Sequence, residues 1–111
     1  MIQYDKNKIL INDKEYTFKN NILEAVSIGE KLIIVFDTDE DGGYDNVYCY
    51  DYNQTKLWRI QPVPKKIGGT ARVPYVGVNI KDKICRVVDF FGRRFVINID
   101  NGCITLMDIV R

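Results

Sequence analysis

The segment Val26-Ser27-Ile28-Gly29-Glu30-Lys31-Leu32-Ile33-Ile34-Val35-Phe36 occurs a second time as Val78-Asn79-Ile80-Lys81-Asp82-Lys83-Ile84-Cys85-Arg86-Val87-Val88. The offset from Val26 to Val78 is 52 residues. Downstream, Tyr50-x-Tyr52-Asn53-x-Thr55-x-Leu57 returns as Ile97-x-Ile99-Asp100-x-Gly102-x-Ile104, with an offset of 47 residues. Both copies consist of β-branched and aromatic runs broken by short polar turns. The chain therefore contains one strand-rich unit twice.

The length of this repeat favours a particular arrangement. Repeats of roughly 40 to 50 residues made of short strands are typical of propeller blades. Two such repeats are too few to close a ring. We therefore expect part of a ring, a half-propeller, whose uncovered surfaces leave room for a partner. The repeat itself predicts no reaction.

The strands expected around the repeat give an all-β fold. We predict two four-stranded antiparallel meander sheets and an N-terminal β-hairpin, because the turns between successive strands are short. As a single domain, the chain divides into a hairpin (1–20), a first blade-like repeat (22–60), a linker rich in Pro, Gly and Lys (61–74) and a second repeat (75–110). The expected strands are 8–12, 15–18, 23–28, 31–36, 46–52, 56–60, 75–80, 83–88, 93–99 and 103–109.

Composition limits the classes of function. The chain has 111 residues, a formal net charge of +1 and 28% charged residues, which indicates one globular domain rather than a general polyanion binder. Nucleic acid is therefore an unlikely partner. The N-terminus has no apolar leader and no apolar run is long enough to span a bilayer, so we expect a cytoplasmic protein without membrane contact.

The cysteine and histidine content argues against metal and acid–base chemistry. Three cysteines without C-x-x-C spacing predict free thiols packed in the core, and the chain has no histidine. Histidine is the commonest general base, and no Ser or Cys lies in a nucleophile motif. We expect a protein that is not an enzyme and that needs no cofactor, unless the acidic loop described below binds calcium.

One segment of the first repeat resembles a known blade motif. Val47-Tyr48-Cys49-Tyr50-Asp51-Tyr52-Asn53-Gln54-Thr55-Lys56-Leu57-Trp58-Arg59 is similar to the quinoprotein-like propeller repeat, in which a strand ends in Asp, a turn contains Thr-Gly and the next strand carries Leu-Trp. Lys56 stands where glycine is usual. The resemblance implies blade geometry only. The aromatics Tyr48, Tyr50, Tyr52 and Trp58 are expected between the two sheets.

The whole chain also resembles a class of small proteins. In size, cytoplasmic character and its solitary set of blades it is similar to half-propeller immunity proteins of bacterial contact-dependent growth inhibition systems. The resemblance implies a concrete function. Such a protein binds and blocks one cognate toxin domain, for instance a nuclease, inside the cell that makes the toxin. A homodimer through the free sheet edges is a further expectation for partners.

The two repeats differ most between 37 and 45, where five additional residues lie in the first copy. This acidic loop, Asp37-Thr38-Asp39-Glu40-Asp41-Gly42-Gly43-Tyr44-Asp45, holds five carboxylates. Its counterpart, Asp89-Phe90-Phe91-Gly92-Arg93-Arg94, is aromatic and basic. The insertion is therefore the candidate functional site.

Three readings of the acidic loop remain open. Partner binding would use Asp37, Asp39, Glu40, Asp41, Tyr44 and Asp45, because crowded carboxylates attract a basic surface and Tyr is frequent at binding hot spots. A calcium site would use Asp37, Asp39, Asp41 and Asp45, since their spacing is similar to the D-x-D-x-D-G-x-x-D loop of integrin-type propellers. The third reading is a solvated loop.

A basic patch is the remaining candidate. Lys65, Lys66, Arg72, Arg93 and Arg94 are near Phe90 and Phe91 in the sequence, which would suit stacking on single-stranded nucleic acid. We expect instead ordinary surface charge beside aromatics that belong to the core.

Overall fold

The computed structural model describes residues 2–69 and 72–108, and it is an all-β protein with three antiparallel sheets. The first sheet contains β1 (Ile2–Asp5), β2 (Lys8–Ile11) and β3 (Lys14–Thr17). The middle sheet contains β4 (Ile22–Ile28), β5 (Lys31–Phe36), β6 (Val47–Asp51) and β7 (Lys56–Arg59). The last sheet contains β8 (Tyr75–Lys81), β9 (Ile84–Asp89), β10 (Arg94–Ile97) and β11 (Ile104–Asp108). A single turn of helix, α1 (Lys65–Gly68), follows Pro64 between β7 and β8.

Within each sheet of the described residues, strands that are consecutive in sequence pair with each other, which confirms the all-β class and the two four-stranded meanders. The N-terminal unit differs from the prediction, because β1 adds a third strand to the expected hairpin. The expected end of the last strand at residue 109, and the predicted boundary at 110, lie outside the described residues.

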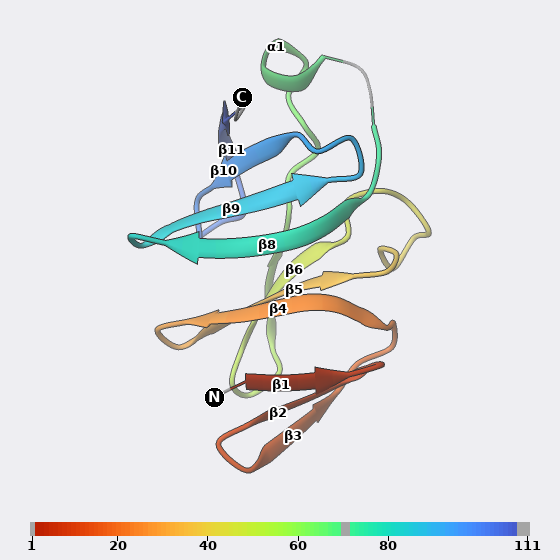
Figure 1. The fold of residues 1–111 in the computed structure, drawn as a ribbon. Helices are drawn as coiled ribbons and strands as arrows, with labels where there is room; N and C mark the ends of the chain where they lie inside the picture. The colour runs from red at the N-terminus through yellow and green to blue at the C-terminus, as the bar shows by residue number, and fades with distance from the viewer. Residues whose placement is uncertain (1, 70–71, 109–111) are drawn as a thin grey trace.

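The three sheets are stacked, with the middle sheet between the other two (Figure 1). One face of the middle sheet packs on the last sheet through Ile33, Val35 and Trp58. Its other face packs on the first sheet through Leu32 and Ile34. Since side chains alternate along a strand, β5 supplies both cores and is buried from Leu32 to Phe36.

The aromatic residues of the first repeat divide between these two cores. Trp58 lies between the middle and last sheets, as expected. Tyr48, Tyr50 and Tyr52 instead pack toward the first sheet, where Tyr16 donates a hydrogen bond from its hydroxyl to the Tyr52 carbonyl over 2.9 Å. The first sheet therefore covers a face of the middle sheet rather than one of its edges.

The structure corrects the residue offset between the two repeats that the sequence predicts. The turn that joins β4 to β5 is closed by Ile28 and Lys31, and the turn that joins β8 to β9 is closed by Lys81 and Ile84, so the structural offset is 53 residues. The sequence alignment gave 52. A slip of one residue moves every side chain to the opposite face of its sheet. The downstream offset of 47 agrees with the structure, because Tyr50 lies opposite Leu32 as Ile97 lies opposite Cys85.

The thiols are free, and two of the three are in the core. Burial raises the pKa of Cys49 to about 11 and the pKa of Cys85 to about 12. Cys103 is only half-buried, against the expectation for it. Among residues 2–69 and 72–108, no helix has the length and apolar character needed to cross a bilayer.

Candidate functional site

The acidic loop connects β5 to β6, and Asp39 is its organising residue. Although it is a carboxylate, Asp39 is only 4% exposed. Its Oδ1 accepts hydrogen bonds from the backbone N–H groups of Asp41 (2.7 Å) and Gly43 (2.9 Å), and its Oδ2 accepts one from Asp45 (3.2 Å). Asp39 therefore holds the loop from within rather than facing a partner.

Two opposing effects act on the ionisation of Asp39. Burial acts to raise its pKa, but hydrogen bonds from the amides of Gly43, Asp41 and Asp45 favour the charged form, and the Arg59 charge adds to them. The net result is a pKa below the ordinary value for aspartate. The carboxylate is thus charged at neutral pH and forms part of the fold.

Three other carboxylates of the loop form ion pairs with basic residues. Glu40 pairs with Lys56 at 3.1 Å and Asp41 pairs with Arg59 at 2.8 Å, both across to β7. The third pair joins Asp45 to Arg72 at 2.7 Å. The Asp41 side chain is still 75% exposed, and Asp37 is exposed at the start of the loop.

The four carboxylates proposed for calcium do not converge. Asp39 turns toward backbone amides, Asp41 toward Arg59 and Asp45 toward Arg72. Within the described ranges, no three His, Cys, Asp or Glu side chains form a group that could hold a metal ion. To bind calcium, Asp41 and Asp45 would have to break their ion pairs with Arg59 and Arg72. Asp39 would have to lose its hydrogen bonds from backbone amides.

The turn built by Asp39 occurs two more times within residues 2–69 and 72–108. In each copy an Asp carboxylate accepts hydrogen bonds from the amides two and four residues later, and its carbonyl accepts one from the amide three residues later. The residue at this third place has a positive φ. The copies begin at Asp39, Asp51 and Asp89, and the positive-φ residues are Gly42, Gln54 and Gly92. The first turn is therefore a structural frame that other loops share.

The copy at Asp89 carries residues that the sequence analysis assigned to the core. Phe90 and Phe91 are 68% and 62% exposed, and their ring centroids are 6.5 Å apart. Asp89 is 1% exposed and pairs with Arg93 at 2.7 Å. The prediction was wrong because apolar letters after a strand favour core, whereas here they occupy the tip of the turn. The Asp-x-x-Gly pattern shared with Asp39 was the available signal.

The acidic loop and the turn 89–93, which we call the aromatic turn, lie at the same end of the stack (Figure 1). Both contact the segment 72–75. Phe90 donates its N–H to the Pro74 carbonyl over 2.9 Å, while Asn46 at the end of the acidic loop binds both the N–H and the carbonyl of Tyr75. We call the loop 37–45, the segment 72–75 and the turn 89–93 together the loop end. Tyr44, 48% exposed, belongs to it.

The basic residues proposed as a patch divide between α1 and the loop end, where Arg72 and Arg93 lie. Lys65 and Lys66 are in α1, whereas Arg72 pairs with Asp45. Arg93 is held by Asp89 and lies over the rings of Phe91 and Phe95 at 5.8 and 5.4 Å. Arg94 is on β10. At least two of the five charges are therefore balanced by carboxylates.

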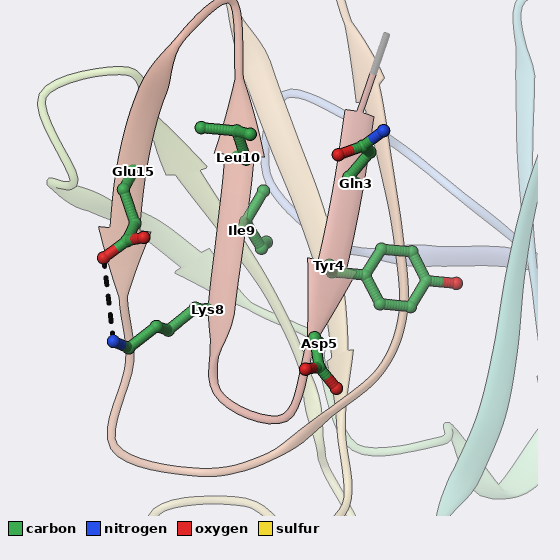
Figure 2. A pocket seen from close by; sticks show the side chains of 7 residues that line it. All are labelled: Gln3, Tyr4, Asp5, Lys8, Ile9, Leu10 and Glu15. Carbon is green, nitrogen blue, oxygen red and sulfur yellow. Dashed lines mark ion pairs between the residues drawn. The ribbon is translucent and has the colours of Figure 1, made fainter.

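A hollow of about 360 Å³ lies elsewhere, on the first sheet (Figure 2). Its charged lining includes Lys8 and Glu15, which form an exposed ion pair at 3.7 Å. The other lining residues, from β1 and β2, are Gln3, Tyr4, Asp5, Ile9 and Leu10. None of the residues predicted for function lines this hollow.

Comparison with known proteins gives a family without an activity. A family model described as a domain of unknown function (DUF7957) matches residues 1–108. The search of curated proteins found no match.

Proposed function

The chain belongs to the DUF7957 family, whose description states no function, and we propose from the loop end that it is a non-enzymatic protein that binds and blocks another protein. The most specific form of the proposal is an immunity protein of the cytoplasm. Its partner would be the cognate toxin domain made by the same cell.

The observation that carries this proposal is the exposure of three large aromatic side chains at one end of the stack. Tyr44, Phe90 and Phe91 are 48%, 68% and 62% exposed, although the same chain buries Tyr48, Tyr75 and Phe95 almost completely. The rings of Phe90 and Phe91 lie together, with centroids 6.5 Å apart, and exposed aromatics of this kind are costly in water and are frequent at protein interfaces. Their gathering at the loop end supports binding rather than catalysis.

Charge at the loop end supports a basic partner. The acidic loop has five carboxylates, and three basic residues, Lys56, Arg59 and Arg72, pair with three of them. Of the two carboxylates that remain, Asp37 is exposed and Asp39 is buried, so the loop keeps a net negative charge. Nuclease active sites are basic because they bind phosphates, and a negative surface accelerates encounter with such a site.

Growth protection tests the proposal. A toxin domain encoded in the neighbouring reading frame would be expressed with and without this chain. We expect the chain to restore growth and to form an isolable complex with the domain. Growth arrest that persists at equal expression levels, with no complex on size exclusion, would refute the proposal.

The role of charge is tested by association kinetics. Asp37→Asn with Asp41→Asn removes two exposed charges and leaves the Asp39 frame intact. We expect slower association and a flatter dependence on salt. The matched control is Asp13→Asn with Asp82→Asn, which changes net charge equally in two turns at the opposite end of the stack (Figure 1). Equal rates for both variants would show that the acidic loop does not guide the partner.

A further inference from the structure

We propose that the aromatic turn is the anchor of the interface, and that Phe90 and Phe91 insert into an apolar pocket of the partner protein that is rimmed by Lys or Arg. This inference rests on the proposed function. The turn 89–93 would supply most of the affinity for the partner, and the acidic loop would accelerate association.

The same turn frame presents two different pairs of residues at its tip. In the frame that begins at Asp39 the two tip residues are Glu40 and Asp41, and in the frame that begins at Asp89 they are Phe90 and Phe91. The frames share the carboxylate bonds to the amides two and four residues later and the carbonyl bond to the third, so these bonds form with either an acidic or an aromatic tip. The tips differ in what they offer to a partner.

The acidic tip forms ion pairs within the chain, whereas the aromatic tip is exposed. Glu40 and Asp41 already pair with Lys56 and Arg59. Exposed pairs of this kind are weak, and they exchange readily with the charges of a partner. The side chains of Phe90 and Phe91 have no polar atom to form a hydrogen bond, so burial against the apolar atoms of a partner would stabilise them.

The aromatic tip is preorganised by hydrogen bonds. The Asp89 carboxylate accepts hydrogen bonds from the backbone N–H of Phe91 (3.0 Å), the backbone N–H of Arg93 (2.9 Å) and Nε of Arg93 (2.7 Å). The Phe90 N–H is held by Pro74. A turn fixed at four points loses little conformational entropy on binding, so more of the gain from burial appears as affinity.

The charges near the aromatic tip indicate the class of partner. The positive charge nearest the tip, on Arg93, is balanced by Asp89, and Arg72 is balanced by Asp45. The acidic loop lies at the same end of the stack, and its Asp45 carboxylate contacts Arg72 (Figure 1). Nucleic acid and anionic membranes require a surplus of positive charge, which these residues do not provide. A protein pocket with a basic rim complements both the aromatic tip and its negative surroundings.

Dissociation kinetics test the inference. The probe is the toxin domain that the proposed function predicts in the neighbouring reading frame, made catalytically inactive, immobilised and exposed to the full chain. Phe90→Ser with Phe91→Ser should raise the dissociation rate at least about tenfold and alter the association rate by less than about threefold. The control, Ile84→Ser with Leu106→Ser, removes two exposed apolar side chains from the last sheet and should leave both rates unchanged.

The outcomes separate the inference from the proposed function. If the wild-type chain does not bind the probe, the proposed function fails. If the wild-type chain binds and the Phe variant dissociates at the wild-type rate, the inference fails while the function stands. Binding of the wild-type chain to oligothymidylate or to phosphatidylglycerol vesicles, lost in the Phe variant, would also overturn the inference. Melting temperatures of all variants serve as the folding control.

Discussion

The side-chain amide of Asn46 pairs with the backbone of Tyr75 in both directions. Its Nδ2 donates to the Tyr75 carbonyl over 2.8 Å, and its Oδ1 accepts from the Tyr75 N–H over 2.8 Å. Nδ2 also donates to the Phe36 carbonyl over 2.6 Å, and Asn46 is fully buried. One side chain thus joins the middle sheet to the last sheet where the acidic loop ends.

Asn46→Asp is expected to destabilise the protein by about 3 kcal/mol at pH 7, because a carboxylate would face two carbonyl oxygens in a buried place. Urea unfolding followed by Trp58 fluorescence measures the change. The loss should shrink as pH falls toward about 4, because burial beside two carbonyl oxygens raises the pKa of the introduced carboxyl above the unfolded value of about 3.9. Asn53→Asp, at an exposed turn, is the control, and equal losses in both variants would contradict the role of Asn46.

Asp39 is expected to stabilise the fold in a pH-dependent way. Its folded pKa is lowered, so the stabilisation is fully present above the unfolded value of about 3.9 and is lost as pH falls through the folded pKa. Asp39→Ala should lose about 1 to 3 kcal/mol at pH 7, because three amides lose their acceptor. The difference from wild type should narrow in acid.

Asp37→Asn is the control for this prediction, because Asp37 is exposed in the same loop. Its unfolding free energy should remain within about 0.5 kcal/mol of wild type. A loss for Asp39→Ala that is constant from pH 7 to pH 2 would show that the carboxylate charge has no part in holding the loop.

Gly102 and Gly92 provide a matched pair at positive φ, 76° and 83°. A Cβ at Gly102 would overlap the ring of Trp58, whereas a Cβ at Gly92 meets nothing within 4 Å. Gly92→Ala should cost about 1 to 2 kcal/mol from its backbone alone, and Gly102→Ala about 1 to 3 kcal/mol more. Chemical denaturation measures both. Equal costs would mean that the Trp58 contact is not tight.

Calcium is expected to leave the melting temperature unchanged at millimolar concentration, because the loop carboxylates are turned toward amides and arginines instead of toward one point. Differential scanning fluorimetry with calcium and with chelator gives the comparison. A rise that Asp41→Asn abolishes would restore the calcium reading of the loop.

The sequence predicted the strand framework because hydrophobic alternation and short turns are local signals. The buried strand Lys31–Phe36 was predicted with the bounds that the structure gives it. The turn of the second repeat was misplaced by one residue. It lies at Asp82 and Lys83, which both have positive φ, a conformation that is costly for residues other than glycine. That displacement produced the offset of 52 in place of 53.

The candidate site was harder to predict because it depends on contacts between distant segments. The charges at 37–45 marked the loop, but nothing local indicated that Lys56, Arg59 and Arg72 would pair with them. The exposure of Phe90 and Phe91 follows from the turn that Asp89 closes. Likewise, which sheet covers Tyr48 depends on how the first sheet folds back, and no pattern within residues 47–59 contains that information.

The repeated Asp turn separates the residues that fold the chain from those that meet a partner. Its first residue and its positive-φ residue build the frame, whereas in the copy at Asp89 the two exposed residues between them are open to change at little cost in stability. A lineage could therefore exchange specificity by altering two codons, without redesigning the scaffold. Family members with different targets should diverge at positions 90 and 91 and retain Asp89.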